Sequence, residues 1–388
     1  MEFRTDDQEA GTYESLGAHI REMHERMMQL APQIMRVACA LYDPADDTLK
    51  TFVNSTREGE ALRSYEAKLS DSYSLTALAE SGDTRVLTDL PTDINTGSAH
   101  SNWVLSMGYK SSLTIPLRFQ DRLLGFLFFD SREHDTFGPE VQRELVLYGR
   151  LIALAIANEL IVIRSILGSV QVAQQFAEMR DLETGAHLSR IARYARVIAK
   201  ALAPAHGLSD EWVEDVFLYS PLHDIGKIGI PDRILLKPGP LTPEERAVMQ
   251  THTTIGLSLV DAITGRLAVQ NEGSTRIMRH VVELHHEALD GSGYPHGLRG
   301  DAIPLEAQVV SVADIFDALT SARPYKPEWT FDAAFAELDR MVAAGRLRAD
   351  AVQALRDHAT EVQLVHDRFH ESAAEEGVIA GAALSSSG

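Results

Sequence analysis

The sequence predicts two domains of different class: an N-terminal α+β domain built on an antiparallel sheet and a C-terminal all-α domain, joined by a long helix. The chain has 388 residues, more than one hydrophobic core usually supports. Strand-like runs separated by turn residues occur only before residue 132, and from about residue 139 the apolar spacing is helical. A composition of 45% hydrophobic and 24% charged residues is typical of globular domains.

The N-terminal elements follow from the spacing of apolar and turn residues. A helix is expected over residues 12–36. Two hairpins are expected, one pairing VACALYD with TLKTFVN and one pairing SSLTIPLRF with LLGFLFFDS, because short turns separate the runs. Between the hairpins we expect a helical stretch, a strand and a polar loop, at residues 75–81, 84–88 and 91–101. A long helix is expected to begin at FGP, residues 137–139, and to run toward Arg180.

These elements give a domain division of the chain. We expect an N-terminal domain over residues 1–155, a connecting helix over 156–180, a helical domain over 181–372 and a flexible tail over 373–388. The connecting helix carries apolar residues along its length that could pair with a second copy, so we predict a parallel homodimer through Ile152, Ile156, Ile163, Ile166 and Val170.

Composition excludes several functional classes. The formal charge of −20 opposes binding to nucleic acid or anionic lipid. Cys39 is the single cysteine, so one chain forms neither a disulfide nor a thiolate metal site. The apolar run at residues 151–163 is shorter than the roughly 20 residues that a membrane span needs. Because the acidic N-terminal stretch has no apolar signal-peptide core, we expect a cytoplasmic protein.

The second half of the chain contains a set of candidate metal ligands. A single histidine or carboxylate is more often an ordinary core or surface residue than a metal ligand. Carboxylates in helical segments as apolar as VVSVADIFDAL are buried only where another charge compensates them, and a metal cluster would do so. The candidate ligands are Glu183, His187, His223, Asp224, His252, His285, His286 and Asp314.

The other histidines do not belong to this set of candidate ligands. We expect solvent-facing roles for seven of them, which stand in polar or amphipathic stretches: His19, His24, His134, His206, His358, His366 and His370.

The motifs in the second half resemble those of the HD-GYP domain, a branch of the HD phosphohydrolase superfamily that hydrolyses cyclic di-GMP. The resemblance covers residues 168–370 and rests on HDIGK, IPDRILLKPGPLTPEE, HTTIG, HHE, DGSGYP and VADIFDALTSARPYK, in the family's order. It implies that the eight candidate ligands bind two or three divalent metal ions, with Glu183 and His187 completing a third position. Nitrogen and oxygen donors without thiolate favour iron or manganese.

The resemblance also implies roles in catalysis and in substrate binding. Metal ions lower the pKa of water, so that hydroxide attacks phosphorus at neutral pH, with Asp224 orienting the nucleophile. Lys227 would neutralise phosphate oxygens or protonate the leaving group. The residues expected to bind substrate are Lys227, Gly293, Tyr294, Arg323 and Lys326. We expect His285 and His286 to face different metals, and Ala288, where relatives usually carry Lys or Arg, to lose a charge at the substrate rim.

Three functions remain open at this point. The first is metal-dependent hydrolysis of cyclic di-GMP to linear pGpG, GMP or both. The second is the same reaction on a cyclic GMP-AMP dinucleotide. The third is a receptor that binds the nucleotide without cleaving it, and the intact ligand set with Lys227 argues against that reading. The family further implicates the GYP turn in contacts with GGDEF-type partner proteins.

The N-terminal half resembles a GAF domain over residues 15–160. The resemblance rests on SSLTIPLRFQDRLLGFLFFDS followed by FGPEVQRELV, and it implies a sensory or dimerising module that modulates the second domain. His100 and Trp103 lie in the expected loop over the domain's pocket. We interpret both as structural residues, because surface histidines and half-buried tryptophans are common.

Overall fold

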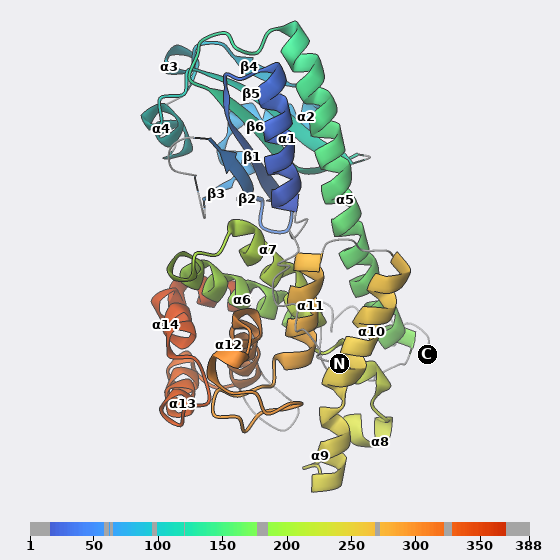
Figure 1. Ribbon diagram of the computed structural model, residues 1–388. Helices are drawn as coiled ribbons and strands as arrows, with labels where there is room; N and C mark the ends of the chain where they lie inside the picture. Colours follow the sequence, from blue (N-terminus) through green and yellow to red (C-terminus); the bar gives the residue numbers. More distant parts are fainter. Residues whose placement is uncertain are drawn as a thin grey trace, which may run out of the picture. The chain divides into compact units, whose positions relative to one another are not determined.

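The computed structural model describes residues 16–57, 62, 65–94, 99–119, 121–176, 185–267, 272–321 and 328–369. They form two compact units, one of residues up to Ile161 and one from Val162 onward, with Glu272 and Gly273 counted in the first. The first unit is a sheet with flanking helices and the second is helical, which confirms the predicted fold class (Figure 1).

The first unit contains a six-stranded sheet with the order β3-β2-β1-β6-β5-β4. All of its ladders are antiparallel, and both predicted hairpins are present as β1–β2 and β5–β6. The strands are β1 (Ile34–Asp43), β2 (Thr48–Thr56), β3 (Glu66–Lys68), β4 (Arg85–Leu87), β5 (Ser111–Phe119) and β6 (Arg122–Ser131). The helices are α1 (Leu16–Leu30), η1 (Leu69–Asp71), α2 (Tyr73–Ser81), α3 (Leu90–Asp93), α4 (Ala99–Ser106) and α5 (Pro139–Phe176).

Alternating residues give the sheet two different faces. Val37, Cys39, Leu113 and Ile115 pack with apolar residues of α1 and α5 in the main core of this unit. Residues on the opposite face, among them Ser112, belong to smaller clusters or line a cavity.

Three predictions for this unit are wrong in detail. The helix over 12–36 ends at Leu30, two residues before Pro32, and the chain then enters β1. The expected polar loop over 91–101 contains α3 and the start of α4, because Leu90 and Val104 bury apolar side chains in a cluster of their own. His24 is buried rather than solvent-facing, bonded to Ser55 Oγ and to a backbone carbonyl.

The α5 helix contradicts part of the expected dimer interface. Ile152 and Ile156 are buried in the core of their own sheet domain, so they are not available to a second chain. The side chains of Ile163, Ile166 and Val170 lie outside the described residues. No helix among the described residues is long and apolar enough to cross a membrane.

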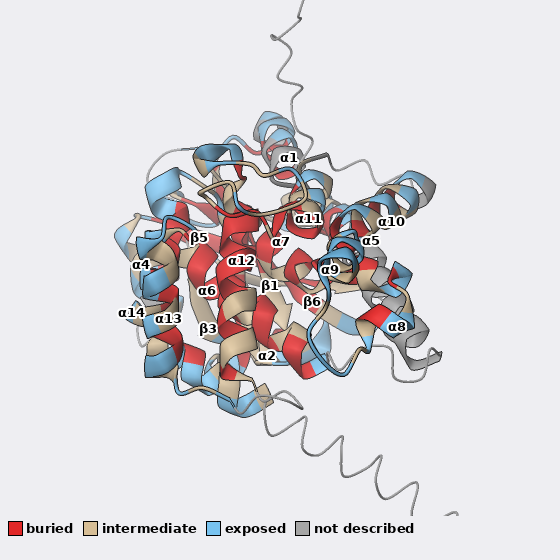
Figure 2. Ribbon diagram, turned by 90° about the horizontal axis from the view of Figure 1, so that it is seen from below, coloured by how far each residue is buried: buried red, intermediate tan, exposed pale blue. Residues whose placement is uncertain are grey.

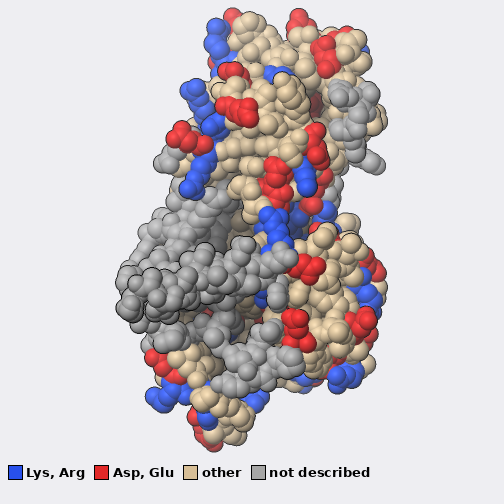
Figure 3. All heavy atoms as spheres, turned by 180° about the vertical axis from the view of Figure 1, so that it is seen from behind, with Lys and Arg blue, Asp and Glu red and all other residues tan. Residues whose placement is uncertain are grey.

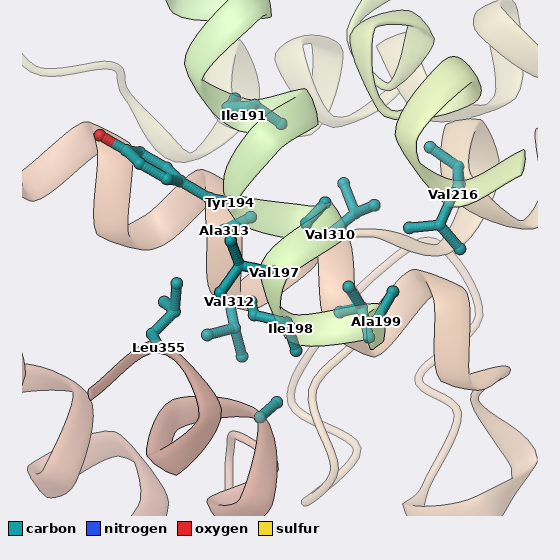
Figure 4. Close-up of a cluster of buried hydrophobic side chains, with 14 of the residues drawn as sticks. Ile191, Tyr194, Val197, Ile198, Ala199, Val216, Val310, Val312, Ala313 and Leu355 are labelled. Carbon is teal, nitrogen blue, oxygen red and sulfur yellow. The ribbon is translucent and has the colours of Figure 1, made fainter. Parts of the chain in front are cut away.

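The second unit is built around two buried helices, α6 (Gly185–His206) and α12 (Leu305–Thr320), drawn mostly in red in Figure 2. In the close-up of Figure 4, Ile191 and Val197 of α6 lie among Val310 and Val312 of α12 and Leu355. The further helices are α7 (Asp210–Tyr219), η2 (Ser220–Leu222), η3 (Ile225–Gly229), α8 (Asp232–Leu235), α9 (Pro243–Gln250), α10 (His252–Leu267), α11 (Glu272–Leu284), η4 (Gly300–Ala302), α13 (Phe331–Ala343) and α14 (Ala349–Asp357).

On the face drawn in Figure 3, acidic and basic side chains are intermixed over the described residues. The acidic excess of the whole chain, 56 Asp and Glu against 36 Lys and Arg, is therefore not separated into one continuous patch on this face.

Candidate metal centre

Seven of the eight predicted ligands lie together in the second unit, in two groups. Within each group, the atoms that could bind a metal lie within 4.8 Å of one another. The two groups adjoin, because His223 Nε2 lies 3.1 Å from Asp224 Oδ2 and 3.9 Å from Asp314 Oδ1. One group is Asp224, His252, His285 and His286, and the other is His187, His223 and Asp314.

The ligands come from segments far apart in the sequence. His187 lies on α6, and Asp314 lies on α12. His223 and Asp224 occupy the break between η2 and η3, and His252 is the first residue of α10. The two adjacent histidines, 285 and 286, directly follow α11. Helix ends and short 3-10 turns supply most of the donors, since they place side chains of one short segment in different directions.

Backbone carbonyls fix the orientation of three imidazoles. Nδ1 of His223 donates to the Ser220 carbonyl at 2.8 Å, and Nδ1 of His285 donates to the Val281 carbonyl at 2.9 Å. His252 Nδ1 makes the same bond to the carbonyl three residues before it, at 2.9 Å. A carbonyl only accepts, so Nδ1 carries the proton and the Nε2 lone pair remains for a metal.

The orientation of the His187 imidazole is fixed by a carboxylate, that of Asp317, instead of a backbone carbonyl. Its Nδ1 lies 2.7 Å from Asp317 Oδ2, and the same carboxylate receives two bonds from Arg190, at 2.6 and 2.9 Å. Burial opposes ionisation of Asp317, but its bonds to His187 and Arg190 outweigh that and lower its pKa to about 2. Asp317 is therefore a charged, buried residue that positions a candidate ligand.

The charge states of the group suit metal binding. Burial opposes ionisation of Asp224, but Lys227 and His223 hold its pKa well below the usual range, and Lys227 Nζ lies 2.8 Å from Asp224 Oδ2. Burial lowers the pKa of His286 to about 3 and that of His285 well below its ordinary value. His285 and His286 are thus neutral and the Asp224 carboxylate is ionised, as metal ligands must be.

Buried atoms in this site test whether metal ions fit it. The Nε2 atoms of His252 and His285 are buried and make no hydrogen bond among the described residues. The Asp224 carboxylate is their neighbour, at 3.1 and 3.9 Å. Lone pairs buried in this way are costly unless a cation meets them. The donor set of imidazoles and carboxylates fits divalent ions such as iron, manganese or zinc.

Comparison with known families places both halves of the chain. A model of the HD domain matches residues 172–350, and a model of the GAF domain matches residues 19–156. The chain combines a GAF domain with an HD domain. Both resemblances in the sequence are thereby confirmed, and the seven donors lie within the HD domain.

Curated relatives match the HD half. The cyclic di-GMP phosphodiesterase response regulator RpfG of Xanthomonas campestris pv. campestris is 45% identical, over 52% of this chain and 50% of that protein. A cyclic di-GMP phosphodiesterase of Thermotoga maritima is 38% identical, over 54% and 57%. The 3'3'-cGAMP-specific phosphodiesterase 2 of Vibrio cholerae is 39% identical, over 47% and 33%. The chain therefore spans about half the length, or less, of these curated relatives.

The glycine-rich turn of the HD domain is held from inside the protein. The buried Glu287 carboxylate accepts hydrogen bonds from the backbone N–H groups of residues 296–298, at 2.7 to 3.1 Å. Gly293 packs so closely on the backbone of residues 286–288 that an added Cβ would lie 2.3 Å from Ala288 N. The turn thereby places the Tyr294 ring 4.7 Å from the ring of the candidate ligand His286.

Two expectations concern this turn. His285 and His286 fall in the same group of candidate ligand atoms, with ring centroids 4.1 Å apart, and their facing different metals stays a prediction. Ala288 is buried, and the loss of a charge at the substrate rim through this alanine stays a prediction.

Some site predictions lie outside the described residues, and some site residues were missed. Glu183, Arg323 and Lys326 lie outside them. The sequence alone indicated no role for Asp317, Glu287 or Arg190. Spacing offered a signal for two of them, since Asp317 follows Asp314 by three residues and Arg190 follows His187 by three, one helical turn in each case.

We predict that the Asp317→Asn variant binds about one metal ion fewer per chain than the wild type, because His187 loses the partner that fixes its ring. Loss of such a partner typically weakens metal binding by 10- to 100-fold. Metal content after dialysis, measured by inductively coupled plasma mass spectrometry, checks this. Asp357→Asn, which changes an exposed carboxylate in the same domain, serves as control.

Arg190 complicates this test, because the single variant leaves a buried guanidinium without its carboxylate. A second variant, Asp317→Asn with Arg190→Met, removes that charge and should show the same loss of metal. Full metal content in the folded double variant would contradict the positioning role of Asp317.

We predict that Gly226→Ala destabilises the HD domain by about 1–3 kcal/mol and lowers its metal content. A Cβ at position 226 would lie 1.8 Å from the carbonyl oxygen of the ligand His252, so η3 and α10 would have to separate. Gly265→Ala is the control within α10: its Cβ meets nothing within 4 Å, and alanine favours a helix by up to about 1 kcal/mol. Thermal denaturation and metal content of both variants decide the matter, and equal behaviour would refute the close approach.

Proposed function

We propose that the HD domain hydrolyses the phosphodiester bonds of a cyclic dinucleotide, with cyclic di-GMP as the substrate and linear pGpG, GMP or both as products. The observation that carries the proposal is the pair of adjoining ligand groups, in which Nδ1 of three imidazoles is bonded to a backbone carbonyl. The named activities of the relatives support the substrate class.

The donors would hold two or three divalent ions, for which we propose iron or manganese. Bound ions supply acidification of water and stabilisation of phosphoryl charge. The Asp224 carboxylate, ionised and held by Lys227, orients the attacking water. The Lys227 ammonium lies beside it, where it can neutralise a non-bridging phosphate oxygen or give a proton to the leaving 3′ oxygen.

The glycine-rich turn, residues 290–295, would form the rim of the site and hold the dinucleotide. Tyr294 presents a ring beside His286, and its phenol stays protonated, because burial and the nearby Asp224 carboxylate raise its pKa. A neutral phenol can donate a hydrogen bond to a phosphate oxygen, and its ring can stack on a base. We also propose that Gly293, Arg323 and Lys326 bind substrate, as the resemblance implies. The contact of the turn with GGDEF-type proteins is likewise part of this proposal.

A specific observation favours a second substrate. A relative that is 39% identical is named a 3'3'-cGAMP-specific phosphodiesterase, a value close to those of the cyclic di-GMP enzymes. The chemistry of the ligand groups is the same for both dinucleotides, since the scissile phosphodiester is the same. The two dinucleotides differ only in their bases, so selectivity between them must come from the rim rather than from the ligand groups.

Anaerobic purification, metal analysis and product chromatography test the proposal together. We expect the ferrous or manganous protein to convert cyclic di-GMP to linear products, and to act on cyclic GMP-AMP at a lower kcat/KM. Faster turnover of cyclic GMP-AMP would replace the substrate. Nucleotide that binds but stays intact would contradict hydrolysis and restore the receptor function.

A matched pair of variants connects that activity to the site. Asp224→Asn should lower kcat by at least about 100-fold, because it removes both a ligand and the group that orients water. Asp261→Asn should leave kcat unchanged, because Asp261 lies in the second half of α10, away from His252, where it forms an exposed pair with Arg279. Equal activity of both variants would rule out the proposed site.

We further propose that the chain forms a parallel homodimer through α5 and that the GAF domain modulates hydrolysis. The face of α5 left exposed by the sheet core carries Leu147, Leu151 and Leu154, each more than half exposed. Their spacing of four and three residues is that of a coiled-coil seam, and Asn158 occupies the next seam position.

Sedimentation equilibrium at micromolar concentration checks the dimer. We expect a dimer for the wild type and a shift toward monomer for Leu151→Lys, because a charge in the seam must be buried. Leu364→Lys changes an exposed leucine of the HD domain and should remain dimeric. A monomeric wild type would refute the interface.

A further inference from the structure

The GAF domain encloses a cavity of about 780 Å³, which plays no part in the chemistry of the HD domain. It lies between the sheet face opposite α1 and α5 and the segments that cover that face. Strands β1, β5 and β6 supply its floor, and residues of α2, α3 and α4 supply its cover. Its volume is within the range of pockets that hold small organic ligands.

The floor carries a buried ion pair. Arg36 Nη1 lies 2.5 Å from Asp130 Oδ2, and both side chains are about 2% exposed. Ser112 Oγ donates to the other carboxylate oxygen at 2.7 Å. The Trp103 ring covers the Arg36 guanidinium, 4.9 Å from ring centroid to Cζ. Asp130 is therefore fully engaged by this floor.

A second guanidinium lines the cavity without a carboxylate partner among the described residues. Arg85 donates to two neutral hydroxyls, Ser74 Oγ at 2.6 Å and Thr114 Oγ1 at 3.2 Å. The Nε atoms of Arg85 and of Arg36 are both buried, and neither makes a hydrogen bond within the described residues. In the described part of the chain, the Arg85 charge is therefore met only by neutral hydroxyls, and an anionic acceptor in the cavity would form a stronger, charge-assisted hydrogen bond with its terminal nitrogens.

The charge of the cavity floor is unbalanced. His100 also lines the cavity, and burial, followed by the nearby Arg36, lowers its pKa to about 4, so it is neutral at pH 7. Among the described residues of the floor, two guanidinium groups then face one carboxylate. The charged residues at the rim, Lys68, Asp71 and Asp93, are exposed and screened by water.

The remaining walls are apolar. Tyr65 and Phe128 flank His100, with ring centroids 5.6 and 5.7 Å from it. The aliphatic side chains that line the cavity are Leu49, Leu62, Leu75, Leu87, Leu90, Ile94 and Val104. A ligand that fits must therefore expose apolar surface over most of its body.

We propose that this cavity binds an amphiphilic organic monoanion, a single acidic group on an apolar or aromatic body. The acidic group accepts hydrogen bonds from the Arg85 guanidinium, and it balances the second guanidinium charge. The body packs against the leucines and the two aromatic rings. Net binding comes from apolar burial, and selection for an anion comes from Arg85.

Two fluorescent probes of nearly the same shape test the proposal on the full-length protein. 8-Anilinonaphthalene-1-sulfonate is an amphiphilic monoanion, and N-phenyl-1-naphthylamine is its uncharged counterpart. We expect the wild type to bind the anionic probe at least about tenfold more tightly than the neutral one. Equal affinities would overturn the proposal, because the cavity would then select for apolar surface alone.

Variants assign the binding to this cavity. Arg85→Met should weaken the anionic probe by at least about tenfold and leave the neutral probe unchanged, and Arg85→Lys should retain most of the affinity. Arg118→Met is the matched control, since Arg118 lies on β5 outside the cavity and bonds to two backbone carbonyls. Thermal denaturation verifies that each variant is folded. Loss of the anionic probe in Arg118→Met, or its retention in Arg85→Met, would refute the assignment.

Discussion

The buried lone pairs of the imidazoles are the constraint on which the HD domain depends. Helices α6 and α12 form an apolar core, and histidines and carboxylates project from them and from neighbouring segments into a space that water scarcely reaches. Desolvation disfavours charge on these rings, so His285 and His286 stay neutral. In His252 and His285, Nδ1 is bonded to a backbone carbonyl and the buried Nε2 makes no hydrogen bond among the described residues, so a bound cation would offset the cost of burying it. Metal ions held at this site would couple metal binding to folding.

The residues around the candidate ligands hold the buried donor atoms in position. Glycines stand where backbones must approach, as at Gly226 beside the His252 carbonyl. Buried carboxylates that are not ligands pair with cations or backbone N–H groups: Asp317 with Arg190, and Glu287 with the turn. Each of these groups holds a donor in place rather than contributing one. His187 and Arg190 of α6 both bond to Asp317 of α12. The second ligand group therefore also helps to hold these two helices together.

The sequence predicted the parts of this structure that depend on local pattern. The fold class, both hairpins and the start of α5 came from apolar spacing, and the ligand set came from motifs whose order is specific. What it did not predict depends on contacts between distant residues. The partner of Asp317 is 130 positions away, and the helices in residues 90–106 form because Leu90 and Val104 find a common cluster. His24 looked exposed because its stretch is amphipathic, yet its ring bonds Ser55, 31 residues on.

Strand β5 connects the cavity of the GAF domain to the long helix. Ser112 and Thr114 face the cavity, whereas Leu113 and Ile115 point the other way into the core that contains α5. A Cβ added at Gly149 of α5 would lie 3.2 Å from Ile115 Cγ2, so helix and strand are in direct contact. Arg85, which the proposed ligand would contact, donates to Thr114 of this strand. Helix α5 continues without a break to Phe176, past the start of the HD match at residue 172, so it is the covalent path along which the proposed modulation would act.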